Sequence, residues 1–298
     1  MKNVQIEAAP ATFQVGRRAA DYVALAKPRL NVLVVASSAA GYYLGSPAAP
    51  ELTPMLLAVC GTALVAGGAA VLNQVYERDT DALMQRTRLR PLPDHRVRTE
   101  EARVFGVVLS VAGTAILALA ANLLAALVAV TTLVIYLGVY TPLKRRSAIS
   151  TLVGAVPGAL PPLIGWTAGR GAIDAGGLTL FAIVFLWQIP HFMAIAWIYR
   201  DDYRRAGFPM LPVIEPDGLR TGRQAVLYAL ALVPVSLVPA LVGVAGLVYF
   251  WFALALGVSF LALSARFAAS RSEGRARALF YGSLVYLPLI WAVMILDH

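Results

Sequence analysis

Three oxygen-bearing side chains recur at helical spacing where a long apolar run ends. Asn73, Glu77 and Asp81 are each four residues apart, so a helix would place all three on one face. Oxygen ligands near the negative end of a helix dipole suit a hard divalent cation. Asn73 and Asp81 would lie about 12 Å apart along the helix axis. Two ions, or one ion plus hydrogen bonds, therefore fit this row better than a single shared ion.

Arginines follow this row in the segment RTRLRP, which contains Arg86, Arg88 and Arg90. Guanidinium is the preferred partner of phosphate oxygens. Mg²⁺ usually binds one or two carboxylates and shares its other positions with substrate phosphate. Acids followed by arginines therefore predict a site for Mg²⁺ and a diphosphate. The alternative is a solvated helix end whose acids balance the arginines, but Asn73 precedes all the charges, which favours a site.

A second polar cluster ends another apolar run, at residues 187–213. His191 and Asp202 are eleven residues apart, about three helical turns, so they share a face and lie roughly 16 Å apart in depth. Asp202 would join the metal site, and Asp201 would replace it if the helix ends early. His191 would lie below the diphosphate as a substrate contact or general base, because ionisable groups within spans tend to be functional. The alternative for His191 is a hydrogen bond between helices.

Three other basic residues are candidates for binding the diphosphate. Lys27 and Arg29 flank a proline at the start of the first apolar run, and Lys144 opens a short basic loop. The alternative is that they only mark the cytoplasmic side of the membrane, where basic residues gather.

The elements that must position these residues are predicted to be membrane-spanning helices. The chain has 298 residues, of which 59% are hydrophobic and only 14% are charged, too few charges to cover a soluble domain. A helix needs roughly 20 apolar residues to cross a bilayer. Five uncharged runs have that length, and two longer runs hold two helices each, with turns near Ala121-Asn122 and between Gly243 and Gly246. The uncharged runs are 30–50, 52–76, 104–143, 147–169, 175–199, 224–265 and 278–296.

The basic residues support a count of nine spans with the N-terminus in the cytoplasm and the C-terminus outside. Under that topology the cytoplasmic segments hold 24 of the 25 basic residues, and only Arg170 falls outside. Both acidic clusters then end helices on the cytoplasmic side and are expected to meet over one cavity. We expect residues 1–20 to form a cytoplasmic tail and residues 21–298 a single all-α transmembrane domain. The cytoplasmic segments are 1–29, 76–103, 144–146, 200–223 and 266–277.

The composition also narrows the class and the compartment. The net charge of +9 reflects membrane orientation rather than nucleic-acid binding, because the basic residues are spread over loops beside anionic lipid. Cys60 is alone within a span, which excludes a disulfide framework and a cysteine metal site. Arginine outnumbers lysine 22 to 3, which is typical of a GC-rich bacterial genome, so we expect the cytoplasmic (inner) membrane of a bacterium.

The motifs resemble those of the UbiA superfamily of intramembrane prenyltransferases. NQVYERDTDALMQRTRLRPL is similar to the first signature of that superfamily. DYVALAKPRLNVL, YTPLKRR, GALPPLIGW and WQIPHF…RDDYRRAGFPML together resemble its heme-farnesylating branch, over almost the whole chain. The resemblance implies a nine-helix bundle that binds Mg²⁺-diphosphate at its cytoplasmic face. It also implies that farnesyl diphosphate and heme b react with water to give heme O and diphosphate, with heme A synthase as a partner.

The resemblance assigns roles to individual residues. Asn73, Glu77 and Asp81 match the first metal motif, Asp202 matches the second, and the phosphate-facing arginines are matched by Arg86 and Arg90. Many relatives have aspartate where this chain has Glu77, a longer carboxylate that still suits a metal. In sister branches the second motif has acids four residues apart, whereas here two are adjacent, so Asp201 and Asp202 both stay open as ligands.

Two other functions fit part of the sequence. A related enzyme that prenylates a quinone head group or a chlorophyll precursor would share the metal motif, and only the second cluster argues for heme. A secondary transporter would place its ionisable residues on broken helices near the membrane midplane. Here both acidic clusters are predicted at helix ends on the same side, which favours an enzyme.

Overall fold

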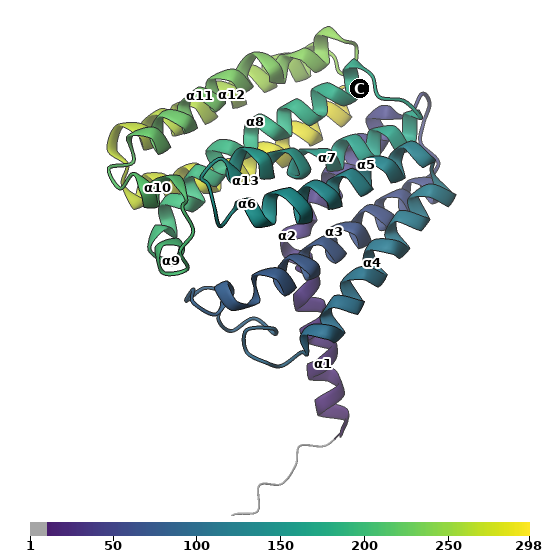
Figure 1. The fold of residues 1–298 in the computed structure, drawn as a ribbon. Coiled ribbons are helices and arrows are strands. Elements are labelled where there is room, and N and C mark those ends of the chain that lie inside the picture. Colours follow the sequence, from purple (N-terminus) through teal and green to yellow (C-terminus); the bar gives the residue numbers. More distant parts are fainter. Residues whose placement is uncertain (1–10) are drawn as a thin grey trace, which may run out of the picture.

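The computed structural model describes residues 11–298, and this part of the chain consists of helices and their connections, without strands (Figure 1). Residues 1–10 of the expected tail lie outside the described part, and residues 11–20 belong to a helix. The helices are α1 Ala11–Ala26, α2 Pro28–Gly45, α3 Leu52–Asp81, α4 Thr99–Ala120, α5 Leu123–Leu133, the π-helix η1 Val134–Tyr140, α6 Thr141–Leu143, α7 Ser150–Arg170, α8 Ala175–Ile198, α9 Arg200–Arg205, α10 Leu211–Ile214, α11 Leu219–Leu241, α12 Leu247–Ser270 and α13 Glu273–Leu296.

The number of potential membrane spans agrees with the sequence-based count. Within residues 11–298, eight helical segments are long and apolar enough to cross a bilayer. The count rises to nine if the bent pair Arg18–Ala26 and Pro28–Gly45, which meet at 46°, forms one span. The two predicted turns are confirmed, because α4 gives way to α5 at Ala121-Asn122 and α11 ends at Leu241 before α12 begins at Leu247. The orientation of the termini stays a prediction.

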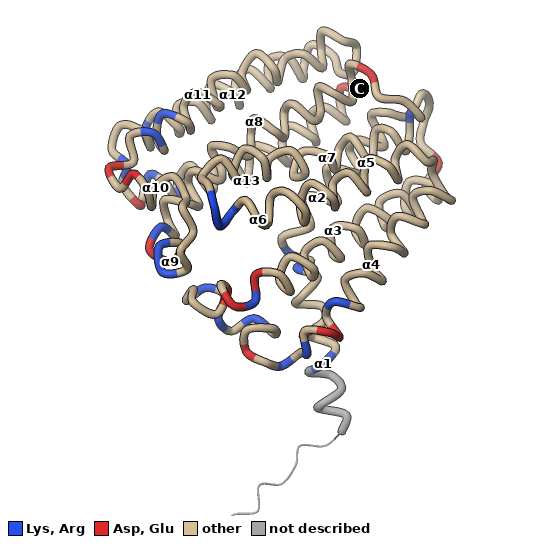
Figure 2. The backbone as a smooth tube through the Cα atoms, viewed as in Figure 1, with Lys and Arg blue, Asp and Glu red and all other residues tan. Residues whose placement is uncertain are grey.

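Three helices form the inside of the bundle and the others cover them. α3, α7 and α8 bury half or more of their most apolar stretch, whereas α4, α11 and α12 bury only 28%. The outer helices expose leucines such as Leu119 and Leu241, as expected for a surface that contacts lipid. Charged residues gather mainly at one end of the bundle, around α9 and the connection after α3 (Figure 2). α3 and α8 therefore end at the same end of the molecule, and this places the two polar clusters there.

Small residues let α2 and α7 pack with their backbones nearly in contact. A methyl group on Gly41 of α2 would overlap the backbone oxygen of Pro162, and one on Gly165 of α7 would overlap that of Ser38. Such contacts are typical of membrane bundles. The hydrophobic effect does not draw helices together within lipid, so they associate through van der Waals packing, and small residues let their backbones approach closely enough for it. α7 stays one continuous helix despite three internal prolines. The close α2–α7 pair fixes one wall of the cavity described below.

Replacing Gly165 by alanine should therefore destabilise the bundle. The added methyl group must push α2 and α7 apart, and overpacking of this kind costs about 1–3 kcal/mol. Thermal unfolding of the purified protein in detergent would measure the loss. Gly274→Ala is the matched control, because a methyl group there meets no atom within 4 Å. Equal melting temperatures for the two variants would contradict the close α2–α7 contact.

Candidate active site

A cavity of about 440 Å³ lies between α2, α3, η1, α7 and α8 and contains most of the predicted site residues. Its wall is mainly apolar along its length and charged at one end, where the acidic row of α3 meets basic residues. The predicted residues that line the cavity are Lys27, Asn73, Glu77, Asp81, Arg86, Arg90, Lys144 and His191. The first cluster and His191 of the second therefore meet at one cavity, whereas Asp201 and Asp202 do not line it.

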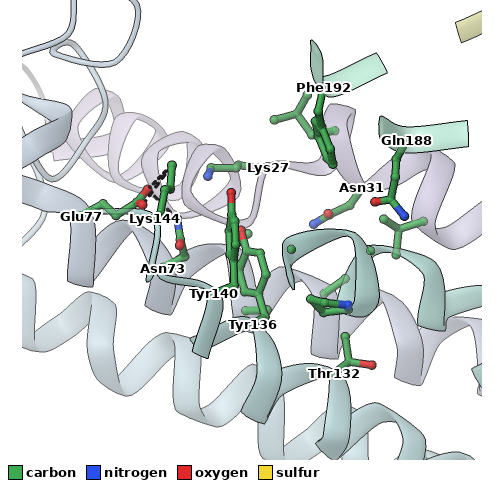
Figure 3. A pocket seen from close by; sticks show the side chains of 18 of the residues that line it. Lys27, Asn31, Asn73, Glu77, Thr132, Tyr136, Tyr140, Lys144, Gln188 and Phe192 are labelled. Atoms are coloured by element: carbon green, nitrogen blue, oxygen red, sulfur yellow. Dashed lines mark hydrogen bonds and ion pairs between the residues drawn. The ribbon is translucent and has the colours of Figure 1, made fainter. Parts of the chain in front are cut away.

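Asn73 and Glu77 are held in a buried network that reaches from α3 to the end of α6. The Asn73 amide donates to Glu77 Oε2 at 3.0 Å, and the Thr141 hydroxyl donates to Asn73 Oδ1 at 2.9 Å. Lys144 Nζ contacts both carboxylate oxygens of Glu77, at 3.0 and 3.2 Å (Figure 3). Asn73 and Glu77 are 4% and 3% exposed, so this network works in a low-dielectric setting where unpaired charges are costly.

Lys144 keeps its charge in this setting because of its neighbours. Burial lowers the pKa of its ammonium, but Tyr140 and the Glu77 carboxylate together raise the pKa above its ordinary value. The ammonium also lies 4.7 Å from the centre of the Phe208 ring, a favourable cation–π distance. Lys144 is therefore available as a cation at the charged end of the cavity.

Asp81 forms the last helical residue of α3 and has one oxygen free. Arg90 donates to Asp81 Oδ2 at 2.7 Å, and the Thr87 hydroxyl donates to the Asp81 backbone oxygen at 2.7 Å. These contacts end the helix and fold the arginine-rich connection back over the acidic row. Asp81 Oδ1 is buried and has no hydrogen-bond partner among the described residues. A buried carboxylate oxygen without a partner is unusual and indicates a site for a ligand.

The oxygen donors fit a divalent metal that brings phosphate with it. Among the described residues, no three histidine, cysteine or acidic side chains converge on one point. Asn73, Glu77 and Asp81 all line the cavity. This set suits Mg²⁺, which takes few protein ligands and completes its shell with phosphate and water.

Lys27 lies at a break between two helices, and the break turns it toward the cavity. Its φ of 50° is left-handed, a conformation that non-glycine residues adopt rarely and mostly at functional positions. The carbonyls freed by the break are satisfied by side-chain amides, Leu25 by Gln74 at 2.6 Å and Ala26 by Asn31 at 2.9 Å. Buried hydrogen bonds therefore stabilise a bend that places a cation beside the acidic row.

Three predicted residues lie elsewhere. Arg29 is exposed and does not line the cavity, because the left-handed break at Lys27 directs Lys27 inward and leaves Arg29 on the outer side of the first turn of α2. Asp201 is also exposed and pairs with Arg204 at 2.8 Å. Asp202 is buried and accepts from the Gln85 backbone N–H at 3.3 Å. The structure thus favours Asp202 over Asp201 as the inward carboxylate.

Asp202 borders a second, shallower hollow that adjoins the main cavity. It pairs there with Arg205, three residues further along α9. Arg86 lines both hollows, and its guanidinium lies 4.8 Å from the centre of the Tyr199 ring. Arg86 therefore connects the acidic row of α3 with the second cluster.

Two tyrosines that the sequence analysis did not single out stand in the middle of the cavity. Tyr136 and Tyr140 stack with ring centres 5.4 Å apart. They lie between Glu77 and Lys144 on one side and Asn31 and Gln188 on the other (Figure 3). They belong to the π-helix η1, a rare form found mostly at functional sites. Their spacing of four residues, continued by Lys144, is the signal that could have identified them.

His191 lines the cavity beyond the charged end and is held by two aromatic rings and a serine. Its ring stacks on Trp187 and Phe280, with centres 5.1 and 5.2 Å away. Its Nδ1 lies 2.7 Å from the Ser283 hydroxyl on α13. His191 therefore forms the expected hydrogen bond to another helix and also lines the cavity, whereas its contact with substrate stays a prediction.

Comparison with known proteins agrees with this fold. A model of the UbiA prenyltransferase family matches residues 34–290. The protoheme IX farnesyltransferase of Solibacter usitatus (strain Ellin6076) is 49% identical over 287 residues, covering 93% of this chain and 98% of the relative. The protoheme IX farnesyltransferase of Koribacter versatilis (strain Ellin345) is 43% identical over 290 residues, covering 93% of each chain.

Solved structures show the same fold at low sequence identity. A digeranylgeranylglyceryl phosphate synthase superposes with a TM-score of 0.79 at 17% identity, over 94% of this chain and 98% of the other. A UbiA homolog from Archaeoglobus fulgidus bound to GPP and Mg²⁺ has a TM-score of 0.67 at 18% identity, over 92% and 99%. At this identity the likeness establishes the arrangement of the helices.

Removing the cation from the Glu77–Lys144 pair should be strongly destabilising. Lys144→Met leaves a buried carboxylate without its counter-charge, a change that costs about 3–5 kcal/mol. Adding Glu77→Gln to Lys144→Met should recover most of the loss, because the charge and its partner are then both gone. Thermal unfolding in detergent measures each step. Arg204→Met, which breaks the exposed pair with Asp201, should cost less than about 1 kcal/mol. A Lys144→Met loss no larger than that of Arg204→Met would contradict the pairing.

Proposed function

The chain belongs to the UbiA prenyltransferase family and is a multi-pass membrane prenyltransferase, and on that premise we propose that it farnesylates heme b. In the proposed reaction, farnesyl diphosphate and water react with a vinyl group of heme b to give heme O and diphosphate. The identity of 49% to a protoheme IX farnesyltransferase, over nearly the full length of both chains, is the observation that carries the choice of substrates.

The charged end of the cavity is the proposed diphosphate site. Lys27, Arg90 and Lys144 line it, and each supplies N–H donors for phosphate oxygens. Arg86 adds a fourth cation where the two hollows meet. As the allylic C–O bond breaks, negative charge develops on the leaving diphosphate, and cations fixed in a low-dielectric site stabilise that charge.

The acidic row is the proposed metal site. Asn73, Glu77 and Asp81 would hold Mg²⁺ from the protein side, and Asp202 would contribute from the second hollow. The bound ion supplies charge neutralisation for the leaving group. Glu77 and Asp81 are paired with Lys144 and Arg90. We infer that these cations turn from the carboxylates toward phosphate when the substrate binds.

The rest of the cavity is the proposed chamber for the hydrocarbon. Apolar and small residues line it beyond the tyrosines, including Val65, Ala66 and Phe192. The allylic cation formed by loss of diphosphate reacts readily with bulk water, so an apolar wall favours transfer to the intended acceptor. Tyr136 and Tyr140 stand between the two regions, where their rings can face a cationic carbon.

The proposed setting is the cytoplasmic membrane of a bacterium, with the charged end of the bundle facing the cytoplasm. The concentration of basic residues at that end supports this orientation. Heme A synthase, which would consume the product, is the proposed downstream partner.

Product analysis tests the reaction. Purified protein in detergent is given heme b and farnesyl diphosphate, with Mg²⁺ or with a chelator, and the products are analysed by mass spectrometry. We expect a heme species heavier by one farnesyl group plus water, formed only with Mg²⁺. Unchanged heme together with a farnesylated quinone precursor would retain the prenyltransferase assignment and reject heme as the acceptor.

Two neighbouring aspartates provide a matched test of the metal site. Asp81→Asn removes the charge of the buried carboxylate that has a free oxygen, and we expect the rate of prenyl transfer to fall by at least about 100-fold. Asp79→Asn removes an exposed carboxylate two residues away, which pairs only with Arg78 among the described residues, and should leave the rate unchanged. The assay is release of diphosphate over a range of Mg²⁺ concentrations. Equal activity of the two variants would exclude Asp81 from the metal site.

A further inference from the structure

His191 makes more directional contacts than packing alone requires. Its ring lies between Trp187 of its own helix and Phe280 of α13, and both stacks are within 28° of parallel. α13 is fixed in register against α8, because Trp187 Nε1 donates to the Ser283 backbone oxygen at 2.9 Å. The stacked rings of Trp187 and Phe280 therefore restrict rotation and tilt of the imidazole, and the contact with Ser283 fixes the position of its Nδ1 edge.

The hydrogen bonds of Ser283 determine which imidazole nitrogen carries the proton. The Ser283 hydroxyl donates to the Phe280 backbone oxygen at 2.5 Å, and a carbonyl oxygen accepts only. A hydroxyl has one proton, so Ser283 Oγ acts as the acceptor toward His191 Nδ1, 2.7 Å away. The neutral imidazole then has its proton on Nδ1 and a lone pair on Nε2.

The lone pair on Nε2 is free for a reactant. Among the described residues, none is hydrogen-bonded to Nε2, whereas the ring lines the cavity. We propose that Ser283 is a positioning residue that fixes the Nδ1-protonated form of His191, so that Nε2 is the base for the water that adds to the prenylated acceptor. This inference rests on the proposed function and assigns a residue to the step that follows farnesyl transfer.

The proposed step balances without a further reactant. The vinyl π electrons form a bond from the terminal vinyl carbon to C1 of the farnesyl group, and the C–O electron pair leaves with diphosphate. The vinyl carbon next to the porphyrin is then electron-deficient. A water oxygen bonds to that carbon while one water proton moves to Nε2 of His191. The product carries a hydroxyl group beside the macrocycle, and the imidazolium later loses its proton to solvent.

The tautomer is the first measurement, because it tests the role of Ser283 without any assay of activity. The chain contains three histidines, so a ¹⁵N spectrum of histidine-labelled protein is simple, and His191→Gln identifies the signal. His298 is an internal reference, because its Nδ1 contacts the backbone oxygen of Val244 at 2.7 Å and must donate to it. We expect His191 to give the same Nδ1-protonated pattern as His298. An Nε2-protonated pattern for His191 in the unaltered protein would overturn the proposal.

Variants of Ser283 then connect the tautomer with the reaction. Ser283→Ala should give a mixture of tautomers and lower kcat by roughly 10-fold, the usual range for loss of a positioning partner, with KM for heme b unchanged. Ser283→Thr keeps the hydroxyl and should restore both the spectrum and the rate. Ser264→Ala is the matched control, since Ser264 is also fully buried and, among the described residues, bonds only to the Phe260 backbone oxygen of its own helix. A fall in kcat and melting temperature that is equal in the Ser283 and Ser264 variants would reduce Ser283 to a structural residue.

His191→Gln separates the base from other roles. Without the base, farnesyl transfer should still release diphosphate, and the heme product should include a species with the farnesyl group but without the added water. If the unaltered protein makes no farnesylated heme at all, the proposed function fails first. If it makes heme O and His191→Gln makes heme O at the same rate, only the inference about His191 fails. A change in the absorption spectrum of bound heme on His191→Gln would place Nε2 on the iron and would also overturn it.

Discussion

The structure depends on keeping ionised carboxylates inside a bundle that otherwise faces lipid. A buried charge is tolerated only when it is paired and hydrogen-bonded, and Glu77 and Asp81 meet this condition through Lys144 and Arg90. Each partner comes from a different segment, so the pairs also join the end of α3 to the end of α6 and to the connection before α4. The charged end of the cavity is thus part of what holds the helix ends together.

The same pairing prepares the site for its proposed substrate. Two of the four cations that line the site are paired with its two carboxylates, and Mg²⁺-diphosphate brings charges of both signs. Binding then exchanges one set of ion pairs for another, with cations turning to phosphate and carboxylates to metal. Such an exchange avoids leaving an uncompensated charge in a low-dielectric cavity at any stage. The free oxygen of Asp81 is buried and has no partner among the described residues before binding.

The sequence was sufficient for much of the fold and for the acidic row. Uncharged runs and basic loops identify the spans, and the spacing of Asn73, Glu77 and Asp81 places them on one face. Contacts between helices were not predictable, because they depend on how each helix is rotated and how deep it lies. Thr141 and Ser283 became visible only when α6 and α13 were placed beside α3 and α8. Lys27 lines the cavity and Arg29 does not because the chain is left-handed at Lys27, and the residue types around that position do not predict this conformation.

The π-helix η1 has a consequence for how this chain tolerates changes in length. A π-turn accommodates one residue more than an α-helical turn, so removal of any residue between Val134 and Tyr140 would allow the segment to relax into an ordinary α-helix. The chain beyond the deletion would then keep nearly its original rotation, because the shorter α-helical segment completes almost the same number of turns as the wider π-helical one. A one-residue deletion here is therefore expected to be tolerated better than one within α3 or α8, where it would rotate everything that follows by about 100°.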